Sequence, residues 1–153
     1  MFDLLIYMFE NYLSSKNNLD FANMTLELEA AGFNNKDIES ALDWFSELKE
    51  MSTKIPKSHS LKLNDKLRIF TEKEKEKISF DSLGFILFLE QAKILNSIER
   101  EIIIDRAMAL NQNIINIEEV RWIVMMTLWT NDKENDYLFV EDALYQTQQS
   151  ILH

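Results

Sequence analysis

Scarcity of glycine and proline is the feature that most restricts what this chain can fold into. Its 153 residues contain two glycines and one proline. Folds built from many short strands need tight turns, and tight turns depend largely on these two residues. The composition therefore predicts long helices and an all-α protein, and the length suits either one domain or two small lobes.

The first fifty residues predict three helices. Apolar residues at helical spacing place one helix over residues 1–13 and a weaker one over 21–31. Gly32 is positioned to end the second helix in a left-handed conformation, and Asn34 to cap the third. The inward stripe of this third helix consists of Ile38, Ala41, Leu42, Phe45 and Leu48.

Residues 51–70 interrupt the helical pattern. They hold the only proline, Pro56, and two short alternating runs around the polar pair Asn64–Asp65, which predict a small β-hairpin. A helix, a helix-turn-helix and then a hairpin is the order of a winged-helix unit, and a plain three-helix lobe is the alternative. We therefore assign an N-terminal lobe to residues 1–50 and a basic linker or hairpin to residues 51–70.

The rest of the chain predicts a C-terminal helical bundle over residues 71–153. Capping signals open helices after Thr71, Asn96 and Asn116. The apolar run from Leu83 to Leu89 is less than half of the roughly 20 residues that a membrane span requires. We therefore expect a buried central helix in the bundle. Its inward residues are predicted to be Leu83, Ile86, Leu87 and Leu89.

Residues that enzymes commonly use are scarce in this sequence. There is no cysteine, and the two histidines are His59 in the expected linker and His153 at the end. The two glycines, Gly32 and Gly84, are too far apart to build a phosphate-binding loop. We therefore predict no catalytic residue, no cofactor and no metal site, and we expect a protein that is not an enzyme.

Charged residues within the apolar helices predict ion pairs. Glu101 lies among Arg100 and Arg106, which is typical of a solvated, salt-bridged helix surface. Glu90, Arg106 and Arg121 stand in more strongly apolar surroundings. A partly buried structural ion pair is the interpretation we favour for them over an active site.

The net charge of −10 disfavours general binding to nucleic acid, because duplex binders concentrate positive charge. One basic cluster runs against this trend and, on a hairpin, would contact phosphates. This basic wing consists of Lys54, Lys57, Lys62, Lys66 and Arg68. The helix over 35–48, which would read the bases, carries four acidic residues against one lysine. A DNA-associated regulator that uses the basic wing, residues 54–68, is therefore the alternative interpretation.

Trp44 is the residue through which we expect the third helix to contact a partner. At about 100° per residue it lies at the edge of the inward stripe, half-exposed, with Asp43 and Glu47 on the polar side beyond it. An aromatic anchor with a polar rim is typical of protein interfaces, although a flanking aromatic also widens a core stripe. We predict that its outer edge contacts another lobe, another subunit or a separate protein.

Several blocks of the sequence resemble the bacterial Smg family, in order and over essentially the whole chain. The blocks are MFDLLIYMFENY, GFNNKDIESALDWFSEL, LRIFTEKE, LGFILFLEQAKILNSIEREIIIDRAMAL, EEVRWIVMMTLW and the terminal ILH. The resemblance implies a full-length, cytoplasmic bacterial protein, and it brings no activity, cofactor or catalytic residue with it. The chain departs from the family pattern mainly around residues 51–66, where it is shorter and more basic.

We therefore interpret the chain as an all-α cytoplasmic protein with at most one small β-hairpin. The function that we favour is a non-enzymatic protein-binding or adaptor module. Its expected partner is a protein of unknown identity, and neither a membrane nor nucleic acid is expected to bind it. The pattern leaves the oligomeric state open.

Overall fold

The structure is a computed structural model that describes residues 2–13, 21–54 and 68–131. Within these ranges the secondary structure is helical, and the described residues form no strand, only one bridge between Ile78 and Ile115. The elements are α1 (Phe2–Met8), a π-helical turn η1 (Phe9–Leu13), α2 (Phe21–Ala30), α3 (Asn35–Thr53), α4 (Glu72–Lys77), α5 (Phe80–Gln91), α6 (Ser97–Met108) and α7 (Ile117–Thr130). The predicted all-α class is confirmed for this part of the chain.

Local sequence signals set most of the helix boundaries. The side chain of Asn34 caps α3 by accepting a hydrogen bond of 2.8 Å from the backbone N–H of Lys36. Asn96 and Glu99 form a complete capping box at the start of α6. Gly32 follows α2 with φ of +96°, as predicted, because a residue without a Cβ tolerates the left-handed region.

The helical stretch that restarts at Thr71 is broken in two. Thr71 caps α4 by accepting from the backbone N–H of Glu74 at 3.2 Å, but α4 ends at Lys77. The backbone N–H of Ser79 then donates to the carbonyl of Ile115 at 3.0 Å, and the Ser79 side chain caps α5. A pairing with a distant loop, which local periodicity does not reveal, separates the two helices.

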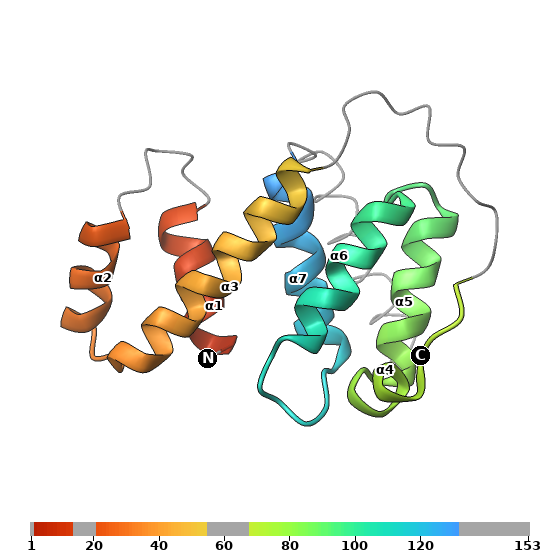
Figure 1. Cartoon of the computed structure of the whole chain (residues 1–153), viewed down its shortest axis with the longest axis horizontal. Coiled ribbons are helices and arrows are strands. Elements are labelled where there is room, and N and C mark those ends of the chain that lie inside the picture. The colour runs from red at the N-terminus through yellow and green to blue at the C-terminus, as the bar shows by residue number, and fades with distance from the viewer. Residues whose placement is uncertain (1, 14–20, 55–67, 132–153) are drawn as a thin grey trace, which may run out of the picture.

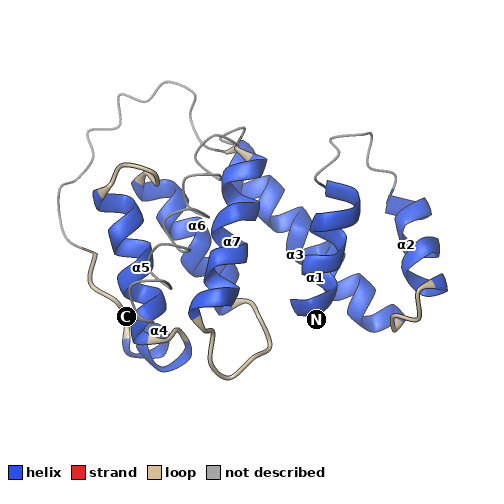
Figure 2. Ribbon diagram, turned by 180° about the vertical axis from the view of Figure 1, so that it is seen from behind, coloured by secondary structure: helices blue, strands red, loops and turns tan. Residues whose placement is uncertain are grey.

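The helices form a row with α2 at one end and α4 and α5 at the other (Figure 1). α3 crosses the middle and contacts α1, α2, α6 and α7. The view from behind shows α7 between α3 and α5, and α7 contacts both of them (Figure 2). Every described helix except α4 adds side chains to one cluster of buried apolar residues. The N-terminal and C-terminal helices therefore share a core, and the division at 1–50, 51–70 and 71–153 stays a prediction.

The expectation of a buried central helix around residues 83–89 is partly wrong. The inner side of α5 is buried as predicted, and its residues include Leu83, Ile86 and Leu89. Leu87 is half-buried, and Phe80 and Phe88 on the outer side are 88% and 52% exposed. α5 lies at the edge of the row with α6 and α7 as its main neighbours, so the described helices cover one of its sides. Across the described residues, no helix has the length and apolar content of a membrane span.

The predicted hairpin falls mostly outside the described residues. α3 continues to Thr53, and residues 55–67 are not described. Residues 68–70 carry no regular secondary structure. α2 and α3 are joined by the expected tight turn at Gly32, while the winged-helix interpretation stays a prediction.

Candidate functional site

Trp44 is buried inside the molecule, so the expectation that it is half-exposed is wrong. It is 3% exposed, and its indole N–H donates a hydrogen bond of 3.0 Å to the backbone carbonyl of Arg106. That carbonyl is among the last four of α6, which an α-helix leaves without an intrahelical donor. α6 packs against the side of α3 that carries Trp44. Trp44 is therefore part of the buried side of α3, next to the predicted inward stripe.

Arg106 returns the contact from α6 to α3. Its buried guanidinium donates to the carbonyl of Trp44 at 3.3 Å and to the carboxylate of Glu47 at 2.7 Å. It also bonds the neighbouring Asp105 at 2.7 Å and lies 5.7 Å from the centre of the Trp44 ring. These reciprocal contacts, which we call the Trp44–Arg106 clasp, join α3 to α6. The partly buried ion pair predicted for Arg106 is confirmed.

The outer side of α3 is acidic and exposed. Four carboxylates lie within an arc of about 80° on the helix wheel. This acidic face consists of Glu39, Asp43, Glu47 and Glu50. Arg106 pairs with Glu47, and Lys54 pairs with Glu50 at 3.2 Å. Within the described part of the chain, Glu39 and Asp43 form no ion pair. Asp43 and Glu47 therefore lie on the surface as predicted, whereas Trp44 lies beneath it.

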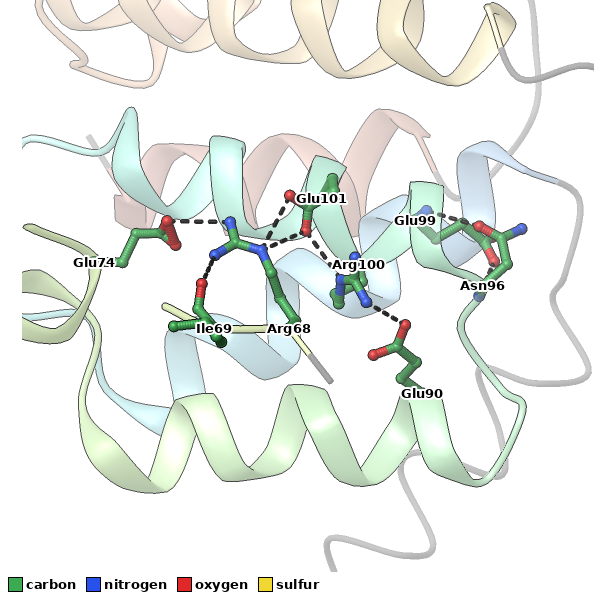
Figure 3. A network of polar contacts seen from close by, with 8 residues as sticks. All are labelled: Arg68, Ile69, Glu74, Glu90, Asn96, Glu99, Arg100 and Glu101. Carbon is green, nitrogen blue, oxygen red and sulfur yellow. Dashed lines mark hydrogen bonds and ion pairs between the residues drawn. The ribbon is translucent and has the colours of Figure 1, made fainter. Parts of the chain in front are cut away.

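A second set of charges ties the segment before α4 to α4, α5 and α6 (Figure 3). Arg68 donates to Glu101 at 3.1 Å and to Glu74 at 3.1 Å. Arg100 donates to the same Glu101 at 2.9 Å and also pairs with Glu90. This arginine network holds four segments together through two arginines. It is the structural ion pairing expected for Glu90, with Arg100 as its partner.

Two carboxyl groups of the C-terminal half have shifted pKa values. Partial burial raises the pKa of Glu101, but hydrogen bonds from Arg68 and Arg100 outweigh burial and leave that pKa below its usual value. Burial raises the pKa of Glu119, and the nearby carboxylate of Asp3 adds to the rise. One oxygen of Glu119 is buried without a hydrogen-bond partner, which agrees with the direction of its shift.

The charged groups of the two sites differ in how they are paired. Among the residues that the structure describes, no three potential metal ligands come together. The arginine network places each carboxylate against a guanidinium, so it fixes elements relative to one another. In the acidic face, by contrast, Glu39 and Asp43 are exposed and form no ion pair among the described residues.

The structure describes two members of the basic wing, and carboxylates pair with both. Lys54 follows α3 and lies 3.2 Å from Glu50. Arg68 belongs to the arginine network and is partly buried. The other members, Lys57, Lys62 and Lys66, lie outside the described residues.

Sequence reasoning missed several partners of α6. The ammonium of Lys77 donates to the carbonyl of Met108 at 2.7 Å and to that of Leu110, at the end of α6. Basic side chains commonly donate hydrogen bonds to the last carbonyls of a helix. Lys77 lies 31 positions from Met108, so no local pattern in the sequence indicates this contact. Glu99 of α6 is fully buried and accepts from the side chain of Asn131 at 2.9 Å.

The fold and these contacts define a small helical protein with arginine–carboxylate ion pairs between its elements and an acidic outer face on α3. A family described as "Protein of unknown function (DUF494)" matches residues 1–153. The chain is 49% identical over 153 residues to a "Protein Smg homolog" of Methylobacillus flagellatus, with 100% of both chains covered. It is 41% identical over 157 residues to a "Protein Smg" of Buchnera aphidicola subsp. Schizaphis graminum, again with 100% of both covered. No solved structure matches the chain.

The chain belongs to the bacterial Smg family. The match covers the full length, so the clasp, the acidic face and the arginine network all lie within the family region. The resemblance inferred from the sequence blocks is therefore confirmed. The names of these relatives state no activity, so function has to be inferred from the geometry.

Proposed function

We propose that this protein is a cytoplasmic, non-enzymatic protein-binding module whose contact surface is the acidic face of α3. The observation that carries the proposal is the exposure of Glu39 and Asp43 one helical turn apart, without an ion pair among the described residues. Like charges at this spacing destabilise a helix by a few tenths of a kcal/mol. A cationic partner would remove that repulsion.

The clasp supports this proposal because it makes the acidic face a fixed surface. Trp44 and Arg106 hold α3 against α6, while Ile38 and Leu48 on the inner side are buried in the shared core. A surface that is already ordered loses little conformational entropy when it binds. The carboxylates therefore present a defined pattern of charge to a partner.

The partner that fits this pattern is a basic segment of another protein. The net charge of −10 favours fast, electrostatically steered association with a cationic surface. The DNA-associated alternative is less well supported, because Glu50 engages Lys54 and the arginine network engages Arg68. The acidic face would also repel a phosphate backbone.

Affinity capture with the full-length chain, followed by quantitative mass spectrometry, tests the proposal. The test variant neutralises the acidic face with Glu39→Gln, Asp43→Asn and Glu50→Gln. The matched control neutralises three exposed acids on other helices, Glu29→Gln, Glu72→Gln and Glu76→Gln. We expect a discrete protein to be captured by wild type and control and to be lost with the test variant. Equal capture by both variants would contradict the proposal.

A further inference from the structure

The outer side of α5 exposes more apolar surface than a solvated helix needs. α5 is apolar on almost every side, and among the described elements its main neighbours α6 and α7 pack on its inner side. Phe80 is 88% exposed and Phe88 is 52% exposed. Contiguous exposed aromatic residues commonly mark a surface that contacts another molecule. We call Phe80, Gly84 and Phe88 the α5 outer face.

The spacing within this face is symmetric. Phe80, Gly84 and Phe88 are four residues apart, so they lie in one row on the helix, within an arc of about 80°. A Cβ added at Gly84 would meet no atom within 4 Å. The centre of the row is therefore open and has no side chain, which permits the backbone of a neighbouring helix to approach closely.

We propose that the α5 outer face binds the same face of a second copy of this chain, with the two α5 helices antiparallel and crossing at Gly84. A two-fold axis at Gly84 places Phe80 of each copy against Phe88 of the other, because both rings stand four residues from the axis. Such an isologous contact is the commonest way in which a soluble protein forms a dimer. The inference is independent of the acidic face, which lies on another helix.

The charges of α5 complement one another in this orientation. Antiparallel helices place the positive end of each helix dipole beside the negative end of the other. Asp81 stands in the first turn of α5, and the exposed Lys93 follows its C-terminal end. In this register Asp81 of each copy is about 9 Å along the helix axis from Lys93 of the other copy, so the opposite charges attract each other without forming an ion pair.

The four exposed rings supply part of the apolar area that a small dimer requires. An aromatic side chain has about 150–250 Å² to bury, so the two exposed fractions correspond to roughly 400–700 Å² for four rings. That is between a third and just over half of the roughly 1,200 Å² at the lower end of stable interfaces. The half-buried Leu87 adjoins Phe88 and extends the same side.

Cysteine cross-linking of the full-length chain tests this geometry, because the native sequence contains no cysteine. Gly84→Cys places one thiol near the two-fold axis, and we expect oxidation to give a disulfide-linked dimer. Phe80→Cys is the matched control. In the proposed dimer the two substituted positions would be about 12 Å apart along the helix axis. A disulfide requires the two Cα atoms to lie within roughly 7 Å of each other.

Sedimentation gives a second readout that needs no cysteine. We expect the wild type to have the mass of a dimer, and Phe88→Asp to have the mass of a monomer with an unchanged helical circular dichroism spectrum. A monomeric wild type at all concentrations would overturn the proposal, including the case in which another part of the chain or a different protein covers α5. A dimer in which Gly84→Cys fails to cross-link, or in which Phe80→Cys alone cross-links equally well, would overturn it too.

Discussion

Replacing Trp44 with phenylalanine isolates one hydrogen bond of the clasp. Trp44→Phe keeps an aromatic ring on the same side of α3 but removes the N–H that donates to the carbonyl of Arg106 at 3.0 Å. Arg106 is buried, and a buried carbonyl left without a donor costs about 1–3 kcal/mol. The smaller ring leaves a cavity that adds on the order of 1 kcal/mol, as modest core truncations do. We therefore expect the free energy of unfolding to fall by about 2–4 kcal/mol.

Urea unfolding followed by far-ultraviolet circular dichroism measures this change without relying on tryptophan fluorescence. Trp122→Phe is the matched control, because Trp122 is only half-buried and contacts Phe9 edge to face at 6.2 Å. We expect the control to cost about 1 kcal/mol or less. A loss for Trp44→Phe within about 0.5 kcal/mol of wild type, or no larger than that of the control, would refute the capping role of the indole.

Five further substitutions test other contacts. Lys77→Met removes the ammonium from the last carbonyls of α6, so it should lower the melting temperature, and an unchanged value would contradict that role. Glu119→Gln should raise the melting temperature at neutral pH, because a raised pKa means that folding disfavours the charged form; the gain should vanish as the pH falls through that pKa. Glu101→Gln should do the reverse, since its lowered pKa gives stability that is present at neutral pH and lost in acid; calorimetry showing the same sign for both would reject these assignments. Ile86→Ala should cost about 2–5 kcal/mol in chemical unfolding, and the half-buried Leu87→Ala less, so equal losses would contradict the orientation of α5.

Features that depend on neighbouring residues could be predicted from the sequence. The caps at Asn34 and Asn96 and the left-handed Gly32 are local, because the groups that they satisfy lie within a few positions. The all-α class follows from the same kind of information, since helical periodicity and a lack of turn residues are properties of short windows. These predictions agree with the described residues.

Features that depend on distant residues could not be predicted in this way. A helix wheel places Trp44 at the edge of a stripe, but it does not show that α6 packs on that flank. In the sequence, Arg68 belongs to a basic cluster. Its partner Glu101 is 33 residues away, so the neighbouring residues do not indicate the ion pair. The break between α4 and α5 depends on the pairing of Ser79 with Ile115, which is also remote in sequence. The apolar composition of α5 likewise predicts burial without showing which side is covered.

Photo-crosslinking in living cells tests most directly whether the acidic face contacts another protein. A photoreactive phenylalanine derivative is placed at the exposed Ser46, which borders the acidic face, and a control chain carries it at the exposed Glu76 of α4. We predict a discrete protein adduct from position 46 that disappears when Glu39, Asp43 and Glu50 are neutralised, and none from position 76. The absence of an adduct at position 46, or the same adducts from both positions, would contradict a protein-binding role for α3.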